Sequence, residues 1–363
     1  MALTPEGLMD ALKAVPDPNT GKNFVATRSL KNLQISEGDV SFDLELGYPA
    51  KSQHAALRKA LVAAAKTVPG VSNVSVNITT KVISHAVQRG VQLMPNVKNI
   101  IAVASGKGGV GKSTTAANLA LALAAEGAAV GLLDADIYGP SQPMMLGIEG
   151  RPESEDGKTM EPLENHGVQV MSIGFLVDQD EAMIWRGPMA TQALEQLLRQ
   201  TNWKDLDYLI VDMPPGTGDI QLTLSQRVPM TGAVIVTTPQ DIALLDAKKG
   251  IKMFEKVGVP ILGIVENMAV HVCSNCGHAE HIFGEGGGKK MAADYKMDYL
   301  GALPLDMQIR LQADNGRPTV VADPDGEVAG IYKAVARKMA VTVAAKSKDF
   351  SAKFPTITIS KNT

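Results

Sequence analysis

Residues 106–113 constrain the fold of this chain more than any other stretch. They read Gly-Lys-Gly-Gly-Val-Gly-Lys-Ser and match the pattern G-x-x-x-x-G-K-[ST]. An apolar run precedes them at 100–104, and a run rich in Ala and Leu follows at 114–126. Strand, glycine-rich turn and helix in this order predict a phosphate-binding loop, because the backbone N–H groups and the helix N-terminus attract phosphate oxygens. We therefore expect a bound nucleotide rather than a glycine-rich turn without a ligand.

Individual residues of this loop and of two strand ends have expected roles. The pattern assigns Lys112 to the β- and γ-phosphates and the Ser113 hydroxyl to Mg²⁺. Asp134 and Asp136 end one apolar run, and Asp212 ends another. Strands of a doubly wound sheet present their carboxyl ends, and their ligands, at one edge. Asp212 therefore has the form of a Walker-B acid that holds Mg²⁺ directly or through water, and the Pro- and Gly-rich turn after it suits a switch loop.

Apolar runs alternate with helix-like runs from residue 99 onward. This alternation predicts an α/β domain with a doubly wound, mostly parallel sheet. The expected strands are 100–104, 129–134, 168–173, 208–211, 233–237, 261–265 and 299–303. Helices are expected at 189–200 and 327–343, with a polar surface excursion at 151–164. The fold class is therefore that of a P-loop NTPase domain.

A small α/β accessory domain is expected ahead of the phosphate loop. Helix-like runs at 5–14 and 55–66 accompany alternating apolar residues at 40–46 and 74–78. We interpret this unit as a module that binds a partner or orders the rest of the chain. The expected division is an accessory domain at 1–90, a linker at 91–98, an ATPase domain at 99–345 and a polar tail at 346–363.

Composition and charge limit the compartment and the partners that we expect for this protein. The 363 residues carry a formal net charge of -3, which gives no basic face for nucleic acid. No run approaches the roughly 18 apolar residues of a membrane span, and the N-terminal residues do not resemble a signal peptide. Two cysteines are too few for a disulfide scaffold. We expect a cytoplasmic protein with neither nucleic acid nor membrane as a partner.

The two cysteines form a C-x-x-C pair, Cys273 and Cys276, in a loop rich in Gly and His. Such a pair in a reduced compartment indicates metal binding or, less well in this fold, redox chemistry. His271, His278 and His281 could complete a zinc site within one chain. Alternatively, two chains related by a twofold axis would supply four thiolates to one [4Fe–4S] cluster. The spacing alone does not choose between zinc and iron–sulfur.

Lys107 departs from an ordinary phosphate loop. With a second lysine, Lys107–Thr114 resembles the deviant Walker A motif of the family that contains nitrogenase iron protein and the cell-division and plasmid-partitioning ATPases. The resemblance implies that Lys107 reaches the nucleotide of a partner subunit, that Asp136 orients the attacking water and that Asp134 lies beside it in switch I. It also implies that Asn267 and Pro304 contact adenine. The expected nucleotide-binding residues of the loop are Gly106, Lys107, Gly108, Gly109, Val110, Gly111, Lys112, Ser113 and Thr114.

Four motifs together closely resemble the Mrp/ApbC iron–sulfur cluster carriers. They are the stretches 134–141, 185–189 and 212–219 and the pair of cysteines. The N-terminal unit likewise resembles small domains of the metal–sulfur cluster assembly type. The resemblance implies a homodimer that holds a [4Fe–4S] cluster, hydrolyses ATP slowly with Mg²⁺, and exchanges the cluster with scaffold proteins and apo-proteins. The alternatives are a partitioning-type ATPase that binds DNA or membrane, and a zinc-stabilised ATPase scaffold.

Overall fold

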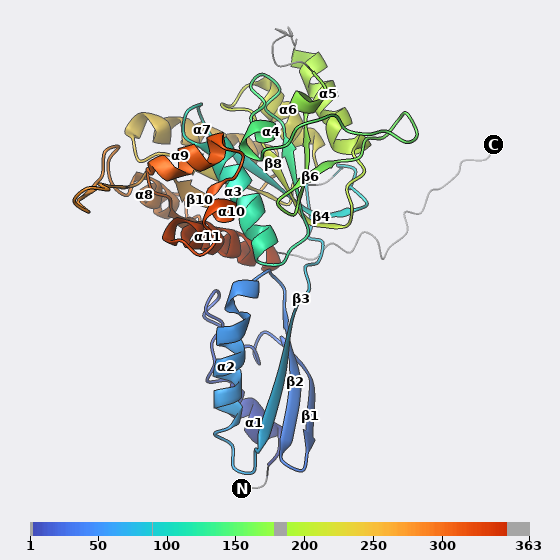
Figure 1. Ribbon diagram of the computed structural model, residues 1–363, viewed down its shortest axis with the longest axis vertical. Coiled ribbons are helices and arrows are strands. Elements are labelled where there is room, and N and C mark those ends of the chain that lie inside the picture. Colours follow the sequence, from blue (N-terminus) through green and yellow to red (C-terminus); the bar gives the residue numbers. More distant parts are fainter. Residues whose placement is uncertain (1–2, 89, 178–186, 347–363) are drawn as a thin grey trace, which may run out of the picture.

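The computed structural model describes residues 3–88, 90–177 and 187–346. A small N-terminal unit and a larger α/β domain follow each other along the longest axis of the molecule (Figure 1). Residues 185 and 186 of the stretch 185–189, and the expected tail beyond Lys346, lie outside the described residues.

The N-terminal unit packs two helices on one face of a three-stranded sheet. Its elements are α1 (Pro5–Leu12), β1 (Leu30–Ser36), β2 (Asp39–Leu46), the 3-10 turn η1 (Lys51–Gln53), α2 (His54–Ala65) and β3 (Asn73–Thr80). Thr4 caps α1 by accepting the Gly7 N–H. The sequence pattern did not predict β1, because a register shift between Lys31 and Gln34 interrupts its alternation of apolar residues.

The larger domain is built on an eight-stranded sheet in the order β13-β10-β9-β4-β8-β5-β7-β6. All neighbouring pairs are parallel except β6 with β7. The strands are β4 (Val97–Ala104), β5 (Val130–Asp134), β6 (Leu163–Asn165), β7 (Val168–Ser172), β8 (Leu206–Asp212), β9 (Gly232–Thr237), β10 (Ile261–Glu266) and β13 (Tyr299–Ala302). All seven expected strands are present, and the expected fold class is confirmed. β4 begins at Val97, two residues inside the expected linker.

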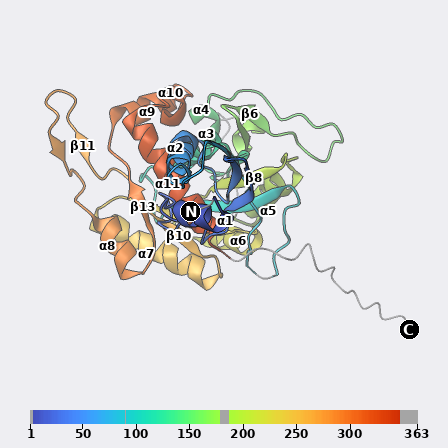
Figure 2. The same cartoon turned by 90° about the horizontal axis from the view of Figure 1, so that it is seen from below.

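Helices cover both faces of this sheet, with α3, α10 and α11 on one side and α6, α7 and α8 on the other (Figure 2). The helices are α3 (Lys112–Ala125), α4 (Gln142–Met145), α5 (Gly187–Gln200), α6 (Asp219–Arg227), α7 (Asp241–Lys256), α8 (Gly287–Asp294), α9 (Met307–Asp314), α10 (Thr319–Ala322) and α11 (Glu327–Ala344), with a 3-10 turn η2 (Ile173–Phe175). A short hairpin, β11 (His271–Val272) and β12 (Ala279–Glu280), projects from the domain. None of the helices among the described residues is long and apolar enough to cross a membrane.

The two parts of the chain meet at the C-terminal end of α3. The buried carboxylate of Glu126 accepts the Ser52 backbone N–H at 2.9 Å and the Ser52 hydroxyl at 2.6 Å. The same carboxylate is paired with Arg337 of α11. The helix that begins at the phosphate loop therefore ends in polar contacts with the N-terminal unit.

Candidate functional site

The phosphate loop joins the end of β4, in the middle of the sheet, to the start of α3. Gly111 has a φ of 78°, and a Cβ there would lie 2.2 Å from Nδ2 of Asn267. That amide nitrogen donates to the carbonyl oxygen of Val110 at 2.8 Å. Glycine is therefore required at position 111 both for its left-handed conformation and for space.

Lys112 of this loop forms a buried ion pair with Asp212, the last residue of β8. The side chain of Lys112 is 6% exposed and that of Asp212 is fully buried. The Lys112 ammonium also lies 3.0 Å from the Ser113 hydroxyl. Lys112 thus contacts both groups that the sequence interpretation assigns to Mg²⁺, the Ser113 hydroxyl and the Asp212 carboxylate.

Asp134 lies directly across from Asp212 in the register of β5 and β8 and is fully buried. Its Oδ2 accepts the backbone N–H groups of Ser141 and Gln142 at 3.0 and 3.1 Å and the Ser172 hydroxyl at 3.1 Å. Burial, and then the charge of Asp212, raises the pKa of Asp134. This carboxyl group therefore holds the segment after β5, the expected switch I, in place.

Asp136 is half-buried, in contrast to Asp134. Its backbone N–H donates to Oδ1 of Asp134 at 3.2 Å. Burial raises the pKa of the Asp136 carboxyl group, and the nearby Lys112 opposes that rise. A partly accessible carboxylate with an elevated pKa near the phosphate lysine suits the expected contact with a water molecule.

The residues expected to contact adenine lie at the ends of β10 and β13. The Ala269 N–H donates to Leu303 O at 3.0 Å, and the Leu303 N–H donates to Glu266 O at 2.8 Å. These bonds bring the turn that contains Asn267 beside the turn that contains Pro304. The two residues are therefore neighbours, and Asn267 also contacts the phosphate loop.

Gln142 of this site was missing from the sequence interpretation, and its neighbour Ser141 was included there only as the end of the stretch 134–141. Gln142 is fully buried, and its Nε2 donates to Ser113 O at 3.1 Å and to Oδ2 of Asp212 at 2.8 Å. Its Oε1 and the Ser141 hydroxyl are buried without a hydrogen-bond partner among the described residues. Buried polar atoms of this kind normally find partners, and the phosphates and hydrated cation of a nucleotide would provide them. The site thus fits Mg²⁺–nucleotide.

The cysteine pair lies at the tip of the hairpin formed by β11 and β12. The Cys273 N–H donates to His278 O at 2.9 Å, and the Gly277 N–H donates to Cys273 O at 2.8 Å. Both thiols are free, and Cys276 is exposed. Hydrogen bonds from the N–H groups of Asn275 and Cys276 lower the pKa of Cys273. A lowered thiol pKa favours the thiolate that binds metals.

Two of the three histidines expected as zinc ligands are turned toward backbone carbonyls. Nδ1 of His271 lies 3.0 Å from Leu305 O, and Nδ1 of His281 lies 2.7 Å from Ala269 O. Within the described ranges, no three His, Cys, Asp or Glu side chains are grouped so that they could hold a metal ion. The part of the chain that the structure describes therefore gathers no side-chain set for a zinc site within one chain.

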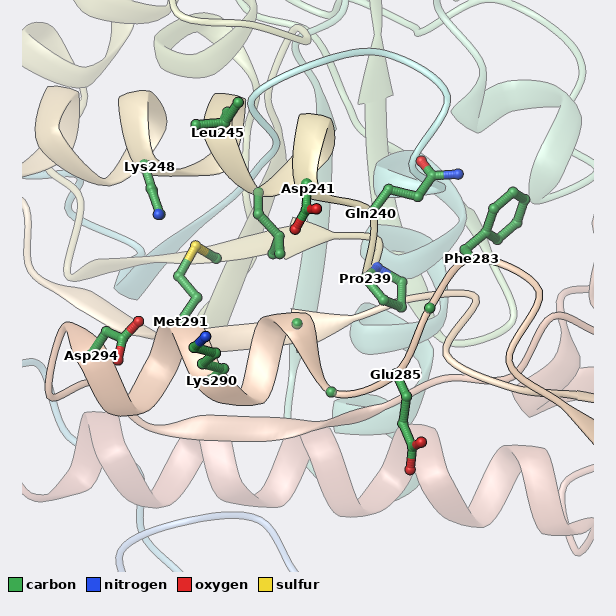
Figure 3. Close-up of a pocket in the computed structure, with 14 residues that line it drawn as sticks. Pro239, Gln240, Asp241, Leu245, Lys248, Phe283, Glu285, Lys290, Met291 and Asp294 are labelled. Atoms are coloured by element: carbon green, nitrogen blue, oxygen red, sulfur yellow. The ribbon is translucent and has the colours of Figure 1, made fainter.

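A cavity of about 600 Å³ lies beside the hairpin, between α7 and α8. Leu245 and Lys248 line it from α7, Lys290 and Met291 line it from α8, and Phe283 lies at one end (Figure 3). It is separate from the phosphate loop, although α7 also touches that loop. A Cβ on Gly106 would lie 2.1 Å from the backbone of Asp246.

Comparison with known proteins identifies the family. The model of the NUBPL iron-transfer P-loop NTPases matches residues 96–340. The chain belongs to this family. A second model, that of an iron–sulfur cluster assembly protein, matches residues 6–78. The resemblance seen in the motifs is confirmed, and the chain is a NUBPL-type NTPase preceded by an assembly-type domain.

The curated relatives of this NUBPL-type chain are named as iron–sulfur cluster carrier or transfer proteins. It is 63% identical to an iron–sulfur cluster carrier protein of Pseudomonas fragi over 75% of this chain and 96% of that protein. It is 47% identical to a carrier protein of Synechocystis over 93% and 97% of the two chains. The mouse iron–sulfur cluster transfer protein NUBPL is 54% identical over 67% and 77%.

Solved structures support the fold. A nucleotide-binding protein of Archaeoglobus fulgidus, solved with ADP, superimposes with a TM-score of 0.56 and 40% identity, covering 64% of this chain and 90% of that one. The cell-division ATPase MinD of Pyrococcus furiosus gives 0.50 and 22% identity over 66% and 98%. The second likeness concerns the fold alone.

Proposed function

We propose that this protein is an ATP-dependent carrier that holds a [4Fe–4S] cluster between two subunits and delivers it to apo-proteins. The observation that carries the proposal is the combination, in one chain, of a phosphate site and a pair of free thiols with which the described part of the chain groups no third metal-ligating side chain. The names of its relatives point to the same cargo.

The phosphate site changes its internal contacts when Mg²⁺–ATP enters. In the free protein Lys112 neutralises Asp212. Lys112 would bind the phosphates of ATP, and the Asp212 carboxylate and the Ser113 hydroxyl would hold Mg²⁺, which would supply the counterion that Asp212 loses. Asp136 orients water for slow hydrolysis, and Lys107 acts on the nucleotide of the partner subunit. Nucleotide binding thereby controls how two subunits approach each other.

The cluster site is a half-site in each subunit. Two thiolates per chain, one with a lowered pKa, need two more to complete a four-thiolate cluster. A half-site on a projecting hairpin opens when the subunits separate, which suits a cargo that must be released. The cluster is therefore substrate rather than a permanent part of the protein.

The direct test measures transfer of the cluster from this protein to an apo-protein. Full-length protein, loaded with iron and sulfide without oxygen, is mixed with apo-aconitase, and aconitase activity is followed with and without Mg²⁺–ATP. We expect activation that depends on the loaded carrier, at a rate that Mg²⁺–ATP changes. If metal analysis finds zinc and no acid-labile sulfide, or if loaded carrier activates no better than free iron and sulfide, the proposal fails.

The subunit contact is expected on the side of the phosphate loop and α7. Ile242 and Leu245 are 65% and 58% exposed on α7, whose backbone packs against the loop that contains Lys107. A partner that receives Lys107 must approach this surface. We predict that Leu245→Asp abolishes ATP-dependent dimerisation, because a carboxylate would be buried there without a partner.

The measurement is the molar mass by light scattering with Mg²⁺–ATP. Leu93→Asp is the matched control, since Leu93 is 40% exposed in the segment before β4. It should dimerise like the wild type. A dimeric Leu245→Asp variant would place the contact elsewhere.

A further inference from the structure

Gln142 joins the two residues whose side chains would hold Mg²⁺. Its single amide nitrogen donates both to the backbone oxygen of Ser113 and to Oδ2 of Asp212. Lys112 occupies the other oxygen of the Asp212 carboxylate. Each oxygen of the Walker-B acid is therefore held by a different part of the nucleotide site.

The backbone of Gln142 is fixed as firmly as its side chain. Its N–H donates to Oδ2 of Asp134, as does that of Ser141, and Asp134 lies across from Asp212 in the sheet. The side chain begins α4 and is fully buried. Its position is thus set by the segment that follows β5, while its amide reaches β8 and α3.

The other end of this amide finds no partner in the described part of the chain. Oε1 is buried and accepts no hydrogen bond from the described residues, although the Nε2 of the same group makes two. An unsatisfied buried acceptor costs free energy until a donor arrives. A water molecule bound to Mg²⁺ is a strong donor, because the cation withdraws electron density from it. Mg²⁺ also keeps several waters when proteins bind it.

We infer that Gln142 is a positioning residue that accepts a hydrogen bond from a water of the Mg²⁺ hydration shell and so makes nucleotide affinity depend on the cation. When Lys112 moves to the phosphates, the amide nitrogen continues to hold Asp212 next to the cation. Switch I is thereby linked to the Mg²⁺ complex through one side chain. The inference rests on the nucleotide part of the proposed function and is independent of the cluster.

The test measures affinity, not turnover. A fluorescent ATP analogue is titrated into the full-length protein with Mg²⁺ and, separately, with EDTA. Gln142→Met keeps the length of the side chain but removes its polar atoms. It should bind Mg²⁺–ATP roughly tenfold more weakly, the scale of one hydrogen bond to a charged group, while its affinity in EDTA changes by less than about twofold.

The Gln142→Glu variant separates two roles of the side chain, accepting a hydrogen bond from water and holding Asp212 in place. Glutamate retains an acceptor for the hydration water and adds charge, but its oxygens repel Asp212. We expect Gln142→Glu to preserve or increase the effect of Mg²⁺. Gln169→Met is the matched control. In the described structure the side chain of Gln169 forms its hydrogen bonds with the backbone of Lys204, away from the nucleotide site. It should behave like the wild type.

The outcomes are distinct. If Gln142→Met loses affinity equally with Mg²⁺ and with EDTA, the side chain only supports the loop and the inference is wrong. If the Gln142→Glu and Gln142→Met variants lose the same Mg²⁺-dependent part of the ATP affinity, the amide serves to hold Asp212 and does not accept a hydrogen bond from water. If the wild type itself binds ATP without regard to Mg²⁺, the proposed nucleotide chemistry fails first.

Discussion

Lys112→Met should eliminate ATP binding and also lower the free energy of unfolding of the nucleotide-free domain by about 3–5 kcal/mol. The physical reason is that Asp212 is fully buried and loses the ammonium group with which it is paired. A buried carboxylate without a counterion is far less favourable than the pair or than neither charge. Unfolding by urea, followed through the buried Trp203, measures the change.

The second variant in this test is Lys112→Met with Asp212→Asn. Removing both charges should restore most of the lost stability while leaving the protein unable to bind ATP. Lys98→Met provides a surface control, because Lys98 pairs with Asp207 at 2.6 Å but is 43% exposed. That change should cost about 1 kcal/mol or less. A single Lys112→Met variant as stable as the wild type would contradict the importance of the buried pair.

Much of the larger domain could be predicted because its strands are buried on both faces. Continuous apolar runs such as those of β4 and β9 stand out without any alignment. The phosphate loop is equally visible, since its glycines and lysine have a fixed spacing. Asp212 was placed beside Lys112 because parallel strands end at a common edge.

The residues that were missed depend on tertiary packing. Gln142 belongs to no spacing pattern, and its burial follows from the way Asp134 draws in the segment after β5. The irregular β1 lost its alternation at a register shift. The histidines around the cysteines looked like ligands in the sequence, but only the fold shows that, among the described residues, they are not grouped with the cysteines as a metal site. Local composition cannot reveal which side chains the fold brings together.

Cys273→Ala should remove the cluster completely while leaving nucleotide binding intact. The hairpin lies apart from the phosphate loop, and each subunit has only two thiols to offer. Losing one thiolate per chain leaves two where the cluster needs four. After reconstitution without oxygen, the wild type should contain about four iron and four sulfide per two chains, and the variant essentially none.

His278→Ala is the control that distinguishes the possible ligand sets. His278 is exposed on the same hairpin, and its carbonyl, not its ring, accepts from the Cys273 N–H. It should retain iron and sulfide at the wild-type level. Loss of metal from His278→Ala would restore the interpretation of a Cys₂His₂ site in one chain, and iron retained by Cys273→Ala would place the cargo outside the hairpin. Because each subunit offers only two thiols, cluster content should also rise and fall with the fraction of dimer.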